Sequence, residues 1–269
     1  MASLSTATDG ELTEFKRRLS AAGFTAEMLR EVNRRYDMAK FMYDALMDHP
    51  AFTLVHGLFV KPEDQIKRVR ELRNERGWNF PDSWLMEAQQ TIPKWPEDRL
   101  VVVTLVPYLD DKREGQEIVM SGIERTFQEL WAVAGKEQHA NWRWDGYNQA
   151  DSKRLRLLKG IEHKPGLRWE VIDLGCNRNK KPVDVRSAKS SPHAGIFATA
   201  ALHPDWPRAM DGDSVPYVFA PGYGVNVSVE RPWQDVPHLG FDRGDRKVNL
   251  RAYASGGYDP FWAVPSFRE

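Results

Sequence analysis

The apolar run RLVVVTLVPYL, from Arg99 to Leu109, constrains the fold more than any other stretch, because its β-branched residues predict a buried strand. It follows the proline-containing segment Ile92-Pro93-Lys94-Trp95-Pro96. Before this segment apolar residues recur at helical spacing, and after it short β-prone runs dominate. We therefore expect an α+β chain, with a helical N-terminal region over residues 1–95 and a second domain over residues 96–269.

Several elements follow from the local patterns. The clearest helix runs from Pro62 to Arg76, with Ile66, Val69 and Leu72 on one side and a charged face on the other. From Pro204 onward, turn residues separate short β-prone runs, which is typical of an irregular β-rich fold. The other expected elements are helices over 12–19, 25–46, 118–134 and 192–202, a strand over 167–175, and a hairpin turn at 221–224.

The composition is that of a globular protein, with 41% hydrophobic and 28% charged residues. The formal net charge is zero, so no basic excess indicates a nucleic-acid partner. Cys176 is the only cysteine, which leaves no pair for an internal disulfide. The first residues lack the apolar core of a secretion signal, and no apolar run approaches the roughly 20 residues of a membrane span. We therefore expect a soluble, cytoplasmic protein.

Four residues of the second half are the strongest candidates for catalysis. His193 and His203 are followed by Asp211 and Asp213, and such residues can build a metal site or an acid/base pair. A hydrolase-type enzyme that uses these four, with or without a divalent metal, is therefore the alternative function. However, HExxH and CxxC spacings are absent, a histidine is favourable at a helix end, and Asp-Gly is a common turn. We expect no catalytic residue, no metal site and no cofactor.

The stretch from Val236 to the C-terminus mixes apolar residues with Tyr, Ser, Gly and Asp. The latter are typical of adaptable binding loops, because Tyr supplies rigid amphipathic area while Ser and Gly accommodate it. An ordinary Gly-rich hairpin loop, and a structural protein that packs on a partner through its tryptophans, stay open as alternatives. The expected buried scaffold of this stretch is Trp233, Leu239, Phe241, Val248, Leu250, Trp262, Val264 and Phe267.

The segment DRGDRKVNLRAYASGGYDPFWAVPSFRE resembles the C-terminus of variable proteins from diversity-generating retroelements, which end in a C-type-lectin-like domain. The final aromatic strand of that family corresponds to Phe261–Arg268. The family's usual terminal Gly-Phe-Arg is Ser266-Phe267-Arg268 here, and an RGGSW-type stretch is not evident. The resemblance implies a prokaryotic binding protein and argues against the sulfatase-maturing oxidation of related enzymes, whose cysteine pair has no counterpart beside the single Cys176.

In that family AAY codons of the terminal repeat are replaced, and changes at their first two bases cannot give Lys, Glu, Gln, Met or Trp. From Val236 onward only Lys247, Trp262 and Glu269 belong to this excluded set, so the resemblance implies that they are fixed framework. It implies a hypervariable surface that binds a protein or other macromolecule, with homo-oligomerisation left open. The expected ligand-binding residues are Asp242, Arg243, Asp245, Arg251, Tyr253, Ser255, Gly257, Tyr258, Asp259 and Phe261.

Overall fold

The computed structural model describes residues 54–55, 58–96, 98, 100–137, 141–143, 155–226, 233–242, 247–257 and 259–268. These residues belong to one compact unit that begins at Leu54. The helices expected over 12–19 and 25–46 lie outside the described residues. Within the described ranges, every helix is too short or too polar to cross a lipid bilayer.

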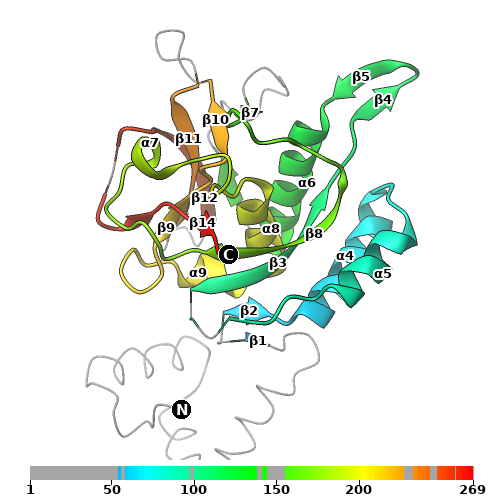
Figure 1. Cartoon of the computed structure of the whole chain (residues 1–269), viewed down its shortest axis with the longest axis horizontal. Helices are drawn as coiled ribbons and strands as arrows, with labels where there is room; N and C mark the ends of the chain where they lie inside the picture. The colour runs from blue at the N-terminus through cyan, green and yellow to red at the C-terminus, as the bar shows by residue number, and fades with distance from the viewer. Residues whose placement is uncertain are drawn as a thin grey trace, which may run out of the picture. The chain divides into compact units, whose positions relative to one another are not determined.

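The first sheet has the order β14-β8-β3 and is antiparallel, with β14 spanning Ser266–Phe267. It contains β3 (Val101–Tyr108) and β8 (Gly166–Asp173), so both strands expected from the apolar runs are confirmed. Every residue of β3 is buried, because helices cover both faces of this sheet (Figure 1). On one face Glu170 approaches Gly195 of the helix α8 (Ala194–Leu202), and on the other Trp169 donates a hydrogen bond to the carbonyl oxygen of Ala88 in the helix α5 (Asp82–Gln90).

The helix α4 (Pro62–Arg76) has the predicted bounds. Proline is at its first position, acidic residues lie in its first turn and Arg73 and Arg76 in its last, and Gly77 ends it with a left-handed backbone, φ 65°. With α5 (Asp82–Gln90), it contributes side chains to the same core as the first sheet. The expected boundary near residue 95 therefore falls inside one packed unit.

The edge of β3 is covered by a side chain of α4. The buried amide of Gln65 donates hydrogen bonds to the carbonyl oxygens of Val60 and Val103, both 2.9 Å long, and accepts one from Leu105 N at 2.9 Å. It thus pairs as a neighbouring strand would, and it satisfies backbone groups that an edge strand leaves open.

The helix α6 (Gly122–Glu137) begins later than the expected start at residue 118. Residues 118–120 instead belong to a hairpin of β4 (Lys112–Glu114) and β5 (Glu117–Met120), which projects from the rest of the unit (Figure 1). The helix α8 (Ala194–Leu202) confirms the helix expected over 192–202. It packs on α6, where the rings of Phe127 and Phe197 lie 4.8 Å apart.

The second sheet is built around β11 (Asp235–Asp242), which pairs along its whole length with β12 (Lys247–Ala254). On its other side β11 pairs with both β9 (Tyr217–Phe219) and β10 (Tyr223–Val225). These two short strands pair with β11 in succession and do not pair with each other, so residues 221–224 do not form a hairpin turn. The remaining elements are β1 (Leu54–Val55), β2 (Phe59–Val60), β6 (Asn141–Arg143), β7 (Leu155–Leu157), α7 (Pro182–Val185) and α9 (Asp205–Ala209).

The C-terminal segment joins the two sheets. Its first part, β13 (Trp262–Ala263), pairs in parallel with β9, and its second part, β14 (Ser266–Phe267), pairs with β8. Helices and strands both contribute to the unit, so the α+β class is confirmed.

Candidate ligand-binding site

The two faces of β12 differ in character. Val248 and Leu250 are fully buried and belong to the main core. Asn249 and Tyr253 are half-buried and Arg251 is exposed, and all three occupy the alternate positions of the strand. Because neighbouring strand residues point to opposite faces, one face of β12 packs on the core and the other is available to a ligand.

The register of the strands extends this outward face to β11 and β9. His238 of β11 lies opposite Arg251, and Gly240 lies opposite Asn249. On the other side of β11, His238 pairs with Phe219 of β9. The side chains of three neighbouring strands therefore meet on the same side of the sheet.

A pocket of about 230 Å³ lies on this outward face. Gly240 lies among its walls without adding a side chain. A Cβ atom at Gly240 would lie 3.4 Å from Tyr217 Cδ1 and 3.7 Å from His238 Cε1, which are ordinary contacts, so a larger residue there would extend between two of the walls. The lining residues are Tyr217, His238, Gly240, Phe241, Asp242, Asn249, Arg251, Tyr253 and Trp262.

Three rings at the pocket pack against one another. The ring centroids of Tyr253 and Trp262 are 4.7 Å apart, and that of His238 lies 4.8 Å from Trp262 and 5.1 Å from Tyr253. Such distances are typical of favourable aromatic pairs. Tyr253 and Trp262 also pack against a small core cluster that contains Phe219 and Val236. These walls are therefore held in place before any ligand binds.

His238 is the buried polar group of the pocket, with 5% of its surface exposed. Burial, assisted by the positive charge of Arg251, lowers the pKa of His238 to about 3. The imidazole is therefore neutral near pH 7. Its Nε2 atom is buried and has no hydrogen-bond partner among the described residues.

The ligand-binding residues expected from the sequence divide into groups. Asp242, Arg251 and Tyr253 line the pocket, and Arg251 Nη1 lies 3.4 Å from the Tyr253 hydroxyl. The positions 243, 245 and 258, which are Arg243, Asp245 and Tyr258, lie outside the described residues.

The expected residues after β12 shape a loop. Ser255 is only 6% exposed, and its backbone bonds to Gln234 and Val183, so the expectation that it lies on the exposed surface is not met. Gly257 N donates to the carbonyl of Ala254 in a turn, and Asp259 Oδ1 accepts from Phe261 N at 2.9 Å. Phe261 is exposed, with 45% of its surface accessible, but it does not line the pocket.

Sequence reasoning missed several pocket residues, namely Tyr217, His238, Gly240 and Asn249. The strict alternation of KVNLRAYA was a usable signal for Asn249, because it places that residue on the same face as Arg251. Trp262 was expected in the buried scaffold, but it is half-buried and forms a pocket wall. Of the expected scaffold, Leu239, Val248, Leu250 and Val264 are buried, whereas Trp233, Phe241 and Phe267 are half-buried.

The four residues of the alternative enzyme do not form one site. His193 and His203 flank the nine residues of α8, and their ten steps of helical rise separate them by about 15 Å. His203 Nδ1 accepts a hydrogen bond from Val60 N at 2.8 Å. Asp211 Oδ1 accepts from Asp213 N at 3.0 Å and from Val215 N at 2.9 Å, as in an aspartate turn.

The sequence suggested that a histidine at the end of α8 is favourable through its positive charge, but His203 does not act in this way. Burial lowers the pKa of His203 to about 3, so the side chain is neutral. A neutral histidine gains nothing from the charge of a helix end. His203 instead holds the short strand β2 through Val60.

A second group of titratable residues lies between β8 and the start of α8. The Tyr108 hydroxyl donates a short hydrogen bond to Glu170 Oε1, whereas Glu170 Oε2 is buried without a partner. Burial, the largest cause, raises the pKa of Glu170 to about 7, although the Tyr108 bond and Arg168 oppose it. The ring of His193 lies 5.3 Å from that of Tyr108, and neither of its nitrogens has a partner among the described residues.

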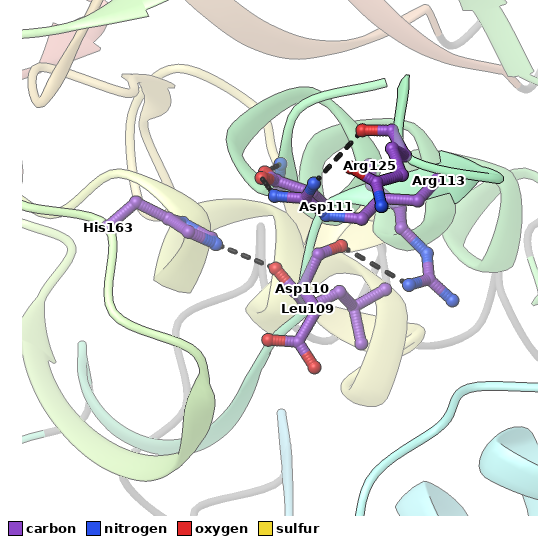
Figure 2. Close-up of polar contacts among 8 residues, drawn as sticks. Leu109, Asp110, Asp111, Arg113, Arg125 and His163 are labelled. Carbon is purple, nitrogen blue, oxygen red and sulfur yellow. Dashed lines mark hydrogen bonds and ion pairs between the residues drawn. The ribbon is translucent and has the colours of Figure 1, made fainter. Parts of the chain in front are cut away.

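The acidic segment after β3 has a structural role (Figure 2). Figure 2 shows His163 directed at the carbonyl oxygen of Leu109, with Nε2 donating at 2.8 Å, and Arg125 directed at that of Asp110, 3.2 Å away. Asp111 Oδ1 accepts from Gly122 N at 2.8 Å. A Cβ atom at Gly122 would lie 2.5 Å from Leu109 O, so only glycine allows this approach. These contacts fix the start of α6.

Within the described residues, no group of three His, Cys, Asp or Glu side chains is placed to hold a metal ion. Comparison of the chain with models of protein families, with curated proteins and with solved structures found no match.

Proposed function

We propose that this protein binds a protein or other macromolecular target through the outward face of β11 and β12. We propose further that this face is the diversified surface of a retroelement variable protein with a C-type-lectin-like domain. The observation that carries the proposal is the division of β12, in which Val248 and Leu250 are buried while Asn249, Arg251 and Tyr253 border a pocket. Binding would rest on shape and on aromatic and arginine anchors, without a chemical step.

This division is what an exchangeable surface needs. Substitutions at Asn249 and Arg251 change side chains that do not enter the core, since the core of the strand pair is supplied by the opposite face. Asp242, Asn249, Arg251 and Tyr253 are all amino acids that an altered AAY codon can encode. Trp262 cannot be encoded in this way, which agrees with a fixed wall.

Deep sequencing of the 3′ end of the gene across a cell population tests the proposal. We expect substitutions at the codons of the outward positions, Asn249, Arg251 and Tyr253, and in the loop 255–261. The codons of Val248 and Leu250, on the buried face, are the internal control and should stay constant. A uniform sequence without a nearby repeat, or equal variation on both faces of β12, would contradict the retroelement proposal.

A further inference from the structure

We propose that the hairpin of β4 and β5 is an interaction surface that binds the same hairpin of a second copy of this chain. In the pair, the two hairpins lie antiparallel about a two-fold axis that passes between Ile118 and Val119. Figure 1 shows this hairpin projecting from the rest of the unit, and none of its residues lines the pocket on the β11–β12 face. The inference therefore goes beyond the proposed ligand-binding role and does not depend on it.

The hairpin exposes two adjacent apolar side chains. Ile118 is 52% exposed and Val119 is 46% exposed, and among the described residues they are the only sequence neighbours whose large apolar side chains are both exposed. Contiguous exposed apolar surface is typical of interaction sites, whereas single exposed apolar residues are common. These two residues are therefore the centre of the proposed contact.

A β-bulge lies at this pair of residues. Arg113 pairs with Ile118 and Lys112 pairs with Met120, so Val119 is the extra residue on β5. A bulge re-aims side chains, so the two apolar neighbours are released from the strict alternation that sends them to opposite faces. The bulge also disrupts the regular edge of β5, which disfavours extension of the sheet by another strand. The contact therefore depends on packing of side chains.

The hairpin receives little support from the rest of the unit. Within the described residues, β4 and β5 pair only with each other, and every residue of the two strands except Met120 is exposed. An isolated two-stranded hairpin is marginally stable in water, and further strands or a covered apolar face are needed to stabilise it. A second hairpin packed on Ile118 and Val119 supplies such cover.

The charges of the hairpin are separated along its length. Glu114 and Glu117 pair across the two strands next to the turn, and like charges directly opposite each other are destabilising. Lys112 and Arg113 lie nearer the base of the hairpin. Arg113 contacts Asp111 at 3.7 Å, whereas Lys112 has no ion-pair partner among the described residues. The acidic tip and the basic base therefore both favour an oppositely charged neighbour.

A second copy supplies these neighbours at the required positions. A two-fold axis at the centre of the apolar pair brings Glu117 of one copy level with Met120 of the other, and Met120 pairs with Lys112. Each acidic tip then meets a basic base, and the contact occurs twice because the interface is isologous. The chain carries 38 basic and 38 acidic residues, so no net charge repels the second copy.

The test is analytical ultracentrifugation of the full chain at concentrations from about 10 to about 500 µM. We expect a reversible equilibrium of monomer and dimer, with a dissociation constant on the order of 100 µM, because two short hairpins make a contact smaller than a standard interface. Monomer at every concentration would overturn the proposal, and so would assembly beyond the dimer, since a two-fold contact closes on itself.

Two substitutions test the apolar contact. The double variant Ile118→Thr and Val119→Thr keeps the branching at Cβ but removes apolar surface, so the dimer should be at least about tenfold weaker. Val183→Thr makes the same change at an exposed valine outside the hairpin and is the matched control, which should dimerise like the original chain. A dimer of unchanged strength in the folded double variant would overturn the proposal.

A charge exchange tests the antiparallel arrangement. Glu117→Lys and Lys112→Glu should each weaken the dimer by about fivefold, because each places like charges together twice. The chain that carries both substitutions restores opposite charges between the copies and should recover the original affinity. Additive losses in the doubly substituted chain would contradict the arrangement.

A disulfide measures proximity directly. On the background Cys176→Ser, which removes the only native thiol, Ile118→Cys places a thiol next to the two-fold axis. Under mild oxidation this chain should form a covalent dimer at least about tenfold faster than a chain with Val183→Cys, since the contact raises the effective concentration of the two thiols. Equal rates would mean that the hairpins meet only by random collision.

Discussion

The rings of Tyr253 and Trp262 are in contact, with centroids 4.7 Å apart, although the two residues come from different strands that do not pair with each other. Tyr253 was expected from the sequence to lie exposed above a buried Trp262. Both residues instead stand side by side as walls of the pocket and pack on the same small cluster. A binding residue of this protein is therefore also a packing residue.

Tyr253→Ala should lower the free energy of unfolding by about 1–2 kcal/mol, because it removes ring contacts with Trp262 and His238. Chemical denaturation measures this loss. Met86→Ala, at a side chain of α5 that is 61% exposed, is the control and should change stability by less than about 0.5 kcal/mol. Equal effects of the two substitutions would show that the Tyr253 ring contributes no packing.

The amide of Gln65 allows a second prediction. Gln65→Leu keeps the size of the side chain but leaves Val60 O, Val103 O and Leu105 N without their partner. We expect a loss of at least about 2 kcal/mol in the free energy of unfolding, because these backbone groups lie in the interior. Lys67→Ala, on the exposed side of the same helix, should be nearly neutral. A similar small effect of both would contradict the role of Gln65 in covering the edge of β3.

The sequence predicted the elements whose pattern has one physical interpretation. The continuous β-branched run before Leu109 suits a strand with two covered faces, and the apolar spacing after Pro62 suits a helix with one covered face. Ile118 and Val119 fit either pattern, and they are in fact exposed on the hairpin strand β5. Local periodicity cannot distinguish these cases, because it does not reveal what packs on the residues.

Only part of the pocket could be predicted from the sequence, because some of its residues come together through strand pairing. Asp242, Arg251 and Tyr253 are polar or amphipathic residues near one end of the chain, so composition singled them out. Tyr217 and His238 join them through strand pairing and register, which depend on the whole sheet.

Glu170 gives a prediction on pH. Its pKa is raised from 4.5 to about 7 in the folded chain, so the folded state binds this proton more tightly than the unfolded state does. The resulting stability is complete below about pH 4.5 and is lost as the pH rises to about 7. Glu170→Gln stays neutral and keeps an acceptor for Tyr108, so it should remove this part of the pH dependence.

The measurement compares the free energy of unfolding of the original chain and of Glu170→Gln at pH 5 and pH 8. The difference between the two chains should grow in favour of Glu170→Gln at the higher pH, by an amount on the order of 2 kcal/mol. Histidines with lowered pKa values, such as His203, act in the opposite direction below about pH 6.5, but they are present in both chains and cancel in the comparison. A constant difference across this range would mean that Glu170 is ionised normally.

Substitutions of residues on the outward face of β12 should lower the free energy of unfolding only slightly. The double substitution Asn249→Ser and Arg251→Ser changes only residues that are half-buried or exposed, so we expect the free energy of unfolding to change by less than about 1 kcal/mol. Leu250→Ala, on the strand position between them, removes a fully buried side chain and should cost about 2–5 kcal/mol. Denaturant titration of the three chains measures both effects. A large loss in the double variant would mean that the outward residues hold the sheet together, and a surface that varies in sequence could not then be built on them.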